Sequence, residues 1–459
     1  MSEFKKRYKK LNKKQREAVD HIDGPLLGVA GPGSGKTELI GLRTANIIEK
    51  TDTPPSSVLC LTFTDTASLN MRERLIDLMG EEGYRVSIHT FHNFCVDVMN
   101  RYPEFFHKGA SFHPADEITK ISIIEQIIRE MDEDDPLSAY HKKEGYIYLS
   151  SIRESIALLK EGGFSPEEFS LTLEKNKKEI PFIEKELSFL NERVSEKMLQ
   201  KINIASERLL LGKSLSRAIG SNLQKIKTTT ALSEFKRKKM IRTDDGYLVK
   251  ESVNIEKMDS LARVYAQYEE RIHEEGYYDF EDMLLQVTSV LKNNEALRFT
   301  LQEKYLYIMV DEFQDTSGVQ MRILELLTEN SVNEGNPNIC VVGDDDQAIY
   351  RFQGAEISNI LRFKDRYRDV KVITLTDNYR STQQIIDTAM EIINRGEERL
   401  EKIIPEVDKN LKAAEKRKGE VVFKRFRTEE EEYSFIVSKI EELKVHYSEV
   451  AVISRLHKS

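Results

Sequence analysis

The chain has 459 residues, of which 39% are apolar and 32% are charged, and 69 Lys and Arg against 78 Asp and Glu give a formal net charge of −9. This length allows about three domains, and the composition excludes collagen-like, low-complexity and generally disordered chains. The negative net charge means that any contact with nucleic acid must come from local basic or aromatic surface.

The sequence shows no sign of a membrane segment or of a disulfide framework. No apolar run approaches the roughly 18 residues that would span a bilayer, and the lysine-rich N-terminus leads into polar sequence instead of a signal-peptide core. The cysteines Cys60, Cys95 and Cys340 lie in apolar runs without metal-ligand spacing, which argues against a zinc site. We therefore expect a cytoplasmic protein with no membrane partner.

Short runs of apolar and β-branched residues indicate buried strands, and the segments between them, such as 38–50 and 67–79, have helical periodicity. Alternating strands and helices predict an α/β fold, in which a parallel sheet is covered on both faces. The strand candidates, in chain order, are Leu26–Ala30, Val58–Phe63, Val86–Phe91, Tyr305–Val310, Ile339–Val342 and Val372–Leu375.

The middle and the end of the chain differ from this pattern. Between residues 110 and 253 strand-like runs disappear and Glu, Lys and Leu dominate, which predicts a large helical insertion. From residue 376 a second α/β lobe begins with a helix over 383–394, a polar linker over 409–418 and two strand candidates, Val421–Phe426 and Glu449–Ser454. A strand so close to residue 459 normally leads into another crossover, so we expect this lobe to be incomplete.

A glycine-rich segment follows the first strand candidate and opens a helix. Its glycines allow backbone N–H groups to converge on phosphate oxygens at the positive end of the helix. Lys36 would reach the β- and γ-phosphates, and the Thr37 hydroxyl would coordinate Mg²⁺. We therefore predict a nucleotide-binding loop made of Ala30, Gly31, Pro32, Gly33, Ser34, Gly35, Lys36 and Thr37.

Two neighbouring carboxylates follow the strand candidate that ends at Val310. Ligands bind at the carboxyl edge of parallel sheets, so these side chains should face the same nucleotide. We predict that Asp311 holds Mg²⁺, directly or through water. Glu312 would orient and deprotonate the attacking water.

Two further blocks contain candidate site residues. Gln347, after the strand candidate that ends at Val342, is suited to hydrogen-bond a γ-phosphate and the attacking water, and the aromatic pair Tyr350 and Phe352 suits unstacked bases. Arg380, at the start of the second lobe, would stabilise charge in the transition state when a cleft closes. The alternatives are core packing for the aromatic rings and a surface ion pair for the arginine.

These four blocks, in this order, resemble the UvrD/Rep/PcrA-type superfamily 1 DNA helicases, and the similarity extends from Leu11 to Ser454. The resemblance implies a RecA-like P-loop NTPase lobe (1–109 and 254–375), a helical insertion (110–253) and the incomplete start of a second RecA-like lobe (376–459). Further matching segments are Leu11–Val19, Thr62–Asp65, Thr90–His92 and Asp279–Asp282.

The resemblance also implies roles for individual side chains. Gln15 would read the edge of adenine, Tyr379 would stack on adenine, and Arg380 would be the arginine finger. Gln15 follows Asn12 by three residues, so it also fits a capping box at a helix N-terminus, and both roles can hold together. The residues expected to contact single-stranded DNA are Phe63, Thr64, His92, Tyr350 and Phe352.

The chain departs from the family pattern at three points. Glu38 stands where the family commonly has Arg, which puts a phosphate or base contact from that position in doubt. Phe352-Gln353 stands where Trp-Arg is frequent, which keeps stacking but loses a charged contact. Motifs V and VI, which supply a second arginine and further DNA contacts, are absent, so we expect the chain to be the N-terminal part of a longer helicase.

The resemblance implies a helicase or translocase that uses ATP and Mg²⁺ to move 3′ to 5′ on DNA in repair or recombination. Its expected partners are single-stranded and junction DNA. One alternative is a nucleotide-gated DNA-binding or scaffold protein that does not unwind. Another is a P-loop small-molecule kinase, which would need an acceptor pocket and would not respond to DNA. The aromatic pair after Gln347 argues against the kinase.

Overall fold

The computed structural model describes residues 3–106, 113–192, 195–243, 246–348, 358–394, 399–414 and 419–454. The chain forms two compact units. The first comprises Met1–Thr376 and Glu398–Asn410, and the second comprises Asp377–Glu397 and Leu411–Ser459. The chain therefore leaves the first unit after Thr376, returns to it for residues 398–410, and then leaves it again.

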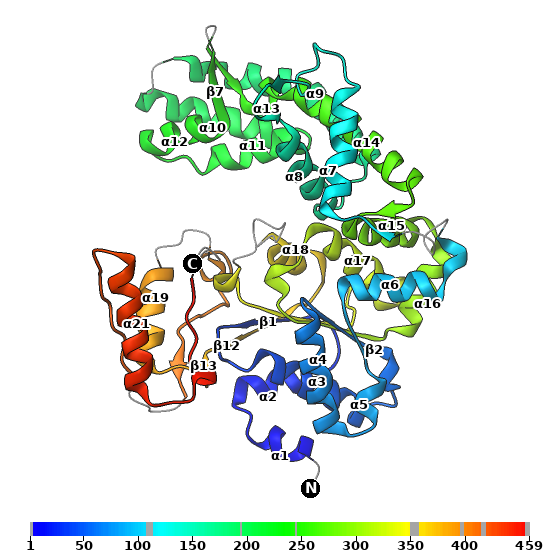
Figure 1. Cartoon of the computed structure of the whole chain (residues 1–459), viewed down its shortest axis with the longest axis vertical. Coiled ribbons are helices and arrows are strands. Elements are labelled where there is room, and N and C mark those ends of the chain that lie inside the picture. Colours follow the sequence, from blue (N-terminus) through cyan, green and yellow to red (C-terminus); the bar gives the residue numbers. More distant parts are fainter. Residues whose placement is uncertain are drawn as a thin grey trace. The chain divides into compact units, whose positions relative to one another are not determined.

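The first unit is built on a six-stranded sheet in which neighbouring strands run parallel (Figure 1). The α/β prediction and all six strand candidates are confirmed, with ends that differ by at most two residues. In spatial order the strands are β12 (Lys371–Leu375), β1 (Leu26–Ala30), β11 (Ile339–Gly343), β10 (Tyr307–Val310), β2 (Val58–Thr62) and β3 (Ser87–Thr90).

Side chains of each strand alternate between the two faces of the sheet. In β1, Leu27 and Val29 belong to one apolar core, and Leu26 and Ala30 belong to the other. The second core is covered by α2 (Lys13–Asp20), α3 (Lys36–Lys50) and α4 (Asp65–Met79) (Figure 1). The first is covered by α6 (Phe91–Arg101), α15 (Phe280–Asn293), α16 (Glu295–Lys304) and α17 (Gly318–Thr328).

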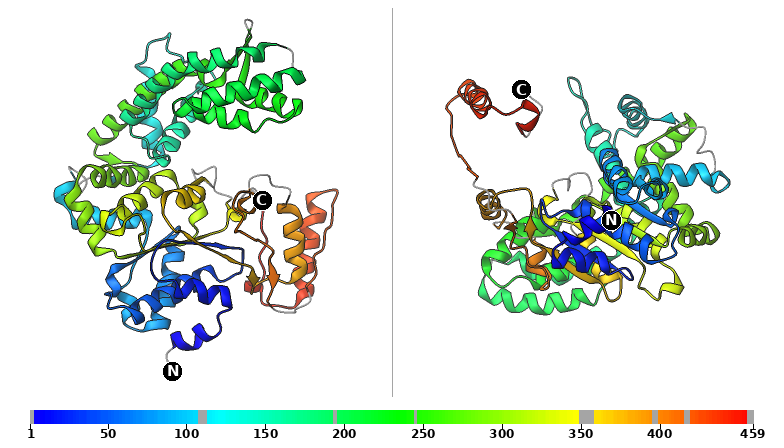
Figure 2. Two further views of the ribbon diagram at one scale, coloured as in Figure 1. Left: turned by 180° about the vertical axis from the view of Figure 1, so that it is seen from behind. Right: turned by 90° about the horizontal axis from the view of Figure 1, so that it is seen from below.

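The predicted insertion is mostly helical, and its helices are coloured cyan to green in Figure 2. Its main helices are α7 (Glu117–Arg129), α8 (Leu149–Glu161), α9 (Pro166–Leu187), α10 (Glu196–Leu210), α11 (Ser214–Gln224) and α12 (Thr229–Lys239). The next long helix, α14 (Ile255–Glu274), begins just after the predicted boundary at residue 253 and packs in one core with α7 and α8. An antiparallel pair, β7 (Met240–Thr243) and β8 (Gly246–Val249), was not predicted, because strands this short show little alternation. Within the described part of the chain, no helix is both long and apolar enough to cross a membrane.

The insertion has two apolar cores that share one helix. Phe169 and Leu173, near the start of α9, pack in the core that includes α7, α8 and α14. Ile183 and Leu187, near its end, pack in the core that includes α10 to α12. Because α9 is continuous through both cores, it joins the two halves of the insertion.

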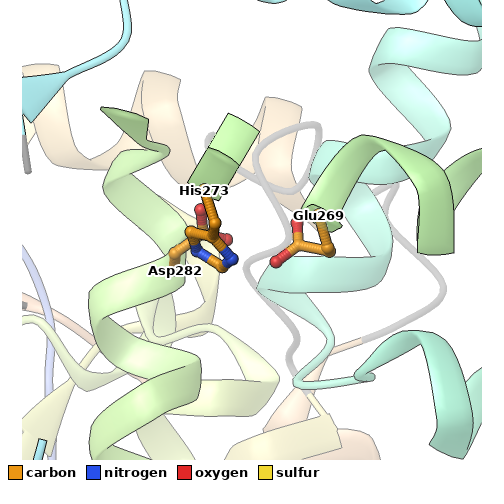
Figure 3. Close-up of side chains that lie close together, drawn as sticks. All are labelled: Glu269, His273 and Asp282. Atoms are coloured by element: carbon orange, nitrogen blue, oxygen red, sulfur yellow. The ribbon is translucent and has the colours of Figure 1, made fainter. Parts of the chain in front are cut away.

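A buried lysine joins the insertion to α15. The Lys160 side chain is fully buried, and its Nζ lies 2.6 Å from Glu269, 2.5 Å from Asp282 and 3.4 Å from Asp279. Glu269, His273 and Asp282 also form a group of metal-ligand type, and Figure 3 shows these three side chains together. Burial raises the pKa of the Glu269 carboxyl to about 7. The Lys160 ammonium already supplies positive charge to these carboxylates, so we assign the group to folding and not to metal binding.

The second unit contains α19 (Gln383–Ile393) and α21 (Glu429–Leu443), and β13 (Asp377–Asn378) pairs in parallel with β14 (Lys412–Ala413). The predicted helix over 383–394 is confirmed.

Two strand predictions in the second unit are wrong. Neither Val421–Phe426 nor Glu449–Ser454 forms a strand among the described residues. A strand requires a hydrogen-bonding neighbour, and the two strands that the structure describes in this unit pair with each other. The apolar side chains of Phe423 and Ile453 are accordingly 93% and 92% exposed. The predicted polar linker is also wrong at its first residue, because Lys409 is buried in the first unit.

Replacing Lys160 by Met should destabilise the fold strongly. The change leaves the buried Asp282 carboxylate without its counter-charge, although Asp279 keeps its ion pair with Lys120 at 2.6 Å. We expect the free energy of unfolding in urea to fall by about 3–5 kcal/mol. The matched control is Lys177→Met on α9, which removes a partly exposed ion pair with Asp259 at 2.9 Å and should cost less than about 1 kcal/mol. Equal losses for the two variants would contradict the role given to Lys160.

Candidate functional site

The glycine-rich loop between β1 and α3 has the backbone conformation that anion binding requires. Gly33 and Gly35 have φ angles of +68° and +85°, in the left-handed region that favours glycine. Gly35 is the N-cap of α3, and no side chain caps the first turn of that helix. The N–H groups of this turn therefore remain available for a ligand at the positive end of the helix.

Gln15 holds this loop from α2. Its backbone and side chain form a capping box with Asn12, as predicted. The Gln15 Nε2 also donates to the Ser34 carbonyl oxygen at 3.0 Å, and the side chain is buried. Gln15 thus connects α2 to the glycine-rich loop. Its recognition of adenine stays a prediction.

The structure brings Lys36, Glu312 and Gln347 together, although they come from three different loops. The Lys36 Nζ donates to Glu312 Oε2 at 2.6 Å and to Gln347 Oε1 at 3.5 Å. Lys36 follows β1, Glu312 follows β10, and Gln347 follows β11, which lies between them in the sheet. The parallel arrangement puts the carboxyl ends of these strands at one edge.

Thr37 and Asp311 form an oxygen pair beside this cluster. The Thr37 hydroxyl donates to Asp311 Oδ2 at 3.1 Å. Burial raises the pKa of the Asp311 carboxyl to about 6, and the negative charge of Glu312 adds to the shift. Adjacent oxygen ligands in an octahedral Mg²⁺ site with bonds of about 2.1 Å are about 3 Å apart, so the spacing and the donor chemistry fit Mg²⁺.

The backbone at Glu312 is strained. Its φ and ψ angles are 49° and 44°, a left-handed conformation that residues with a side chain rarely adopt. Such strain persists only where the surrounding structure imposes it, and it concentrates at functional sites.

Gln314 is a site residue whose role the sequence did not reveal. Its Nε2 donates to Glu312 Oε2 at 2.8 Å, and its Oε1 accepts from the Asp344 backbone N–H at 2.8 Å. It therefore links the loop after β10 to the loop after β11. A Cβ on Gly343 would lie 2.7 Å from Gln314 Oε1, so this close approach requires glycine.

Glu38, which departs from the family pattern, is engaged by two arginines. Arg74 on α4 forms an ion pair with its carboxylate, and Arg7 on α1 (Glu3–Lys9) lies 3.5 Å from it. The acidic side chain in the first turn of α3 therefore has its charge balanced within the first unit.

A partly exposed aromatic surface follows β2 and β3 at the same edge of the sheet. Phe63 and Thr64 follow β2, and Thr64 caps the N-terminus of α4. His92 lies in the first turn of α6, after β3, and burial lowers its pKa, so its ring is neutral near pH 7. The sequence analysis did not predict a role for Phe280, whose ring is 51% exposed and lies 5.0 Å from the His92 ring.

Four further predicted residues are outside the described part of the first unit. Tyr350 and Phe352 are outside the described residues. Tyr379 and Arg380 belong to the second unit, and both are exposed. The Asn378 side chain accepts from the backbone N–H groups of Arg380 and Ser381 at 2.8 Å and 2.7 Å, which fixes the turn that carries them.

A parallel sheet with a glycine-rich loop after one strand and an acidic pair after a nearby strand defines the RecA-like P-loop class of α/β proteins. Within that class, the chain belongs to the UvrD/REP helicase family. The UvrD/REP helicase N-terminal domain matches residues 11–368, and the UvrD-like helicase C-terminal domain matches residues 373–459.

Curated relatives carry the name ATP-dependent DNA helicase PcrA. The chain is 26% identical over 450 residues to the relative from Leuconostoc citreum and 27% identical over 451 residues to that from Bacillus subtilis (strain 168). Each alignment covers 97% of this chain and 47% of the relative. The chain therefore spans about half the length of the curated relatives that it matches.

Replacing Gln314 by Ala tests the link between the two loops. The change leaves the buried Asp344 N–H without its acceptor and should lower the free energy of unfolding by about 1–3 kcal/mol. On the role predicted for Glu312, which loses a positioning contact, the change should also slow ATP hydrolysis on the order of tenfold to a hundredfold.

The matched control is Gln302→Ala. Gln302 is another buried glutamine of the first unit, and it donates to the Leu326 and Glu329 carbonyl oxygens. We expect Gln302→Ala to lose a similar amount of stability without a change in the rate of ATP hydrolysis. A comparable fall in the hydrolysis rate of both variants would contradict the positioning role of Gln314.

Proposed function

We propose that the chain carries the ATP-hydrolysing motor of a DNA helicase that moves 3′ to 5′ along a single strand. The observation that carries the proposal is the contact of the Lys36 ammonium with both Glu312 and Gln347. In this proposal residues 1–109 and 254–375 form the first RecA-like lobe, 110–253 the insertion, and 376–459 the second lobe.

The arrangement suits hydrolysis of a triphosphate. Phosphate oxygens of bound ATP would replace Glu312 and Gln347 as partners of Lys36, because they offer more negative charge to the ammonium. Glu312 would then accept a proton from water as the water oxygen bonds to the γ-phosphorus. The bond from the γ-phosphorus to the bridging oxygen breaks, which gives ADP and phosphate. Thr37 and Asp311 would hold Mg²⁺, which offsets the phosphate charge.

Three further assignments follow the family resemblance. Gln15 would recognise the edge of adenine with the donor and acceptor capacity that its contacts leave free. In the second unit, Tyr379 would stack on adenine, and Arg380 would stabilise the charge that develops on the γ-phosphate.

The DNA strand would run along the aromatic surface at the carboxyl edge of the sheet. Phe63, Thr64 and His92 are the predicted contacts there, and we add Phe280, because its exposed ring extends the surface beside His92. Stacking on such rings contributes about 1–3 kcal/mol per base without sequence preference. Tyr350 and Phe352 would add to this surface, and forked or junction DNA would supply the duplex to be opened.

Replacing Glu312 by Gln should abolish most DNA-stimulated ATP hydrolysis. Loss of a general base lowers the rate by about a hundredfold or more, while ATP binding should persist. The measurement is phosphate release with and without single-stranded DNA, and exposed Glu295→Gln is the control that keeps full activity. Absence of DNA stimulation in the unaltered chain would favour the kinase or the nucleotide-gated scaffold over the motor.

Replacing Phe280 by Ala should weaken binding of single-stranded DNA. The loss of about 1 kcal/mol or more from one stacking platform corresponds to roughly fivefold in Kd. Fluorescence anisotropy with a labelled oligothymidylate measures it. Phe299→Ala removes a ring of similar exposure from α16 and should leave the Kd unchanged. Equal effects of the two variants would contradict the proposal that Phe280 contacts the DNA.

A further inference from the structure

The residues Arg399–Asn410, here named the return segment, lie between two parts of the second unit but pack in the first unit. The chain leaves the second unit, is held in the first over these residues, and enters the second unit again at Leu411. The return segment includes the short helix α20 (Leu400–Ile403).

Buried charge pairs hold both ends of the return segment on the loop after β11. The Lys409 Nζ lies 2.8 Å from Asp344 Oδ1 and 3.0 Å from Asp346 Oδ2, and it also contacts Asp345. Arg399 makes two bonds of 2.9 Å to the Asp346 carboxylate. Charge-assisted bonds of this kind are the strong hydrogen bonds of proteins, so the segment is firmly attached to this loop.

Lys409 is the counter-charge of the loop. Its side chain is 4% exposed. Burial opposes the charge on Lys409, but the carboxylates of Asp344 and Asp345 outweigh this effect and raise its pKa. The side chain is therefore an ammonium ion at neutral pH, and its removal would leave Asp344 buried without a cation.

The same loop reaches the phosphate site through Gln347. The Gln347 Nε2 donates to Asp344 Oδ2 at 2.7 Å, and Gln347 Oε1 faces Lys36 Nζ at 3.5 Å. Lys409 fixes one oxygen of Asp344, and Gln347 binds the other. Because an amide group is planar, the bond from its nitrogen determines where its oxygen points.

We propose that Lys409 is a positioning residue for the ATP reaction: by fixing Asp344, it orients the Gln347 amide toward the γ-phosphate end of the site. The inference rests on the function proposed above. Lys409 lies on the stretch of chain that connects two parts of the second unit.

The contacts predict selectivity between nucleotides. Gln347 meets Lys36 at the terminal ammonium, the atom that reaches the β- and γ-phosphates in this class of loop. The Gln347 Nε2 carries two hydrogens, and its bond to Asp344 uses one of them. The second would donate to an oxygen of the γ-phosphate, a group that ADP lacks. Loss of Lys409 should therefore weaken the binding of ATP and leave the binding of ADP nearly unchanged.

The first experiment compares Kd values of the full chain for ADP and for a non-hydrolysable ATP analogue, both with Mg²⁺. Lys409→Met should weaken analogue binding roughly tenfold, a coupling of ordinary size between linked sites, and Lys409→Arg should restore most of the preference for the analogue. The ratio of the two Kd values does not depend on the fraction of folded protein, so a purely structural role for Lys409 would leave it unchanged.

The matched control is Glu406→Gln. Glu406 also attaches the return segment to the first unit, through an exposed ion pair with Lys364 at 3.0 Å, but it has no contact with Asp344 among the described interactions. This variant should keep the wild-type ratio of Kd values.

The second experiment needs no variant, so it tests the coupling between the return segment and the ATP site even if Lys409→Met does not fold. Hydrogen exchange of the return-segment amides should be slower with the ATP analogue than with ADP, because coupling between two sites is reciprocal. Equal exchange in the two states, or an unchanged Kd ratio in folded Lys409→Met, overturns the inference and leaves the proposed function standing. If the wild type binds neither nucleotide, the proposed function fails and the inference fails with it.

Discussion

The ion pair between Lys36 and Glu312 is the interaction on which the site depends. The two residues are 276 positions apart in the sequence, and their side chains meet at 2.6 Å. This contact requires β1 and β10 to end at one edge of the sheet, and Glu312 makes it from a left-handed backbone conformation. In the proposed function a triphosphate, which carries more negative charge than the Glu312 carboxylate, would replace it as the partner of Lys36.

Much of the fold and of the phosphate site was predictable because local patterns determine it. Runs of apolar residues identified the six strands, and glycines 33 and 35 marked positions that need a positive φ. Once the strands were known to be parallel, the residues after them had to share an edge, which brought Lys36, Asp311 and Glu312 together without any knowledge of distances.

The residues that the sequence did not reveal depend on distant partners. Gln314 becomes important only when the loop after β11 lies against it, and Phe280 only when His92 lies beside it. Lys409 sits in a lysine-rich stretch that suggests solvent, but its partner Asp344 lies 65 positions earlier. The strands expected at 421–426 and 449–454 fail for the same kind of reason, because a strand depends on a neighbour that its own residues do not specify.

The buried contacts of Lys160 bear on how the insertion and the lobe depend on each other. Asp279 and Asp282 stand at the start of α15, while the lysines that neutralise them, Lys120 and Lys160, belong to the predicted insertion. Shortening the insertion to a simple linker would therefore remove the counter-charge of both aspartates together with side chains that cover them.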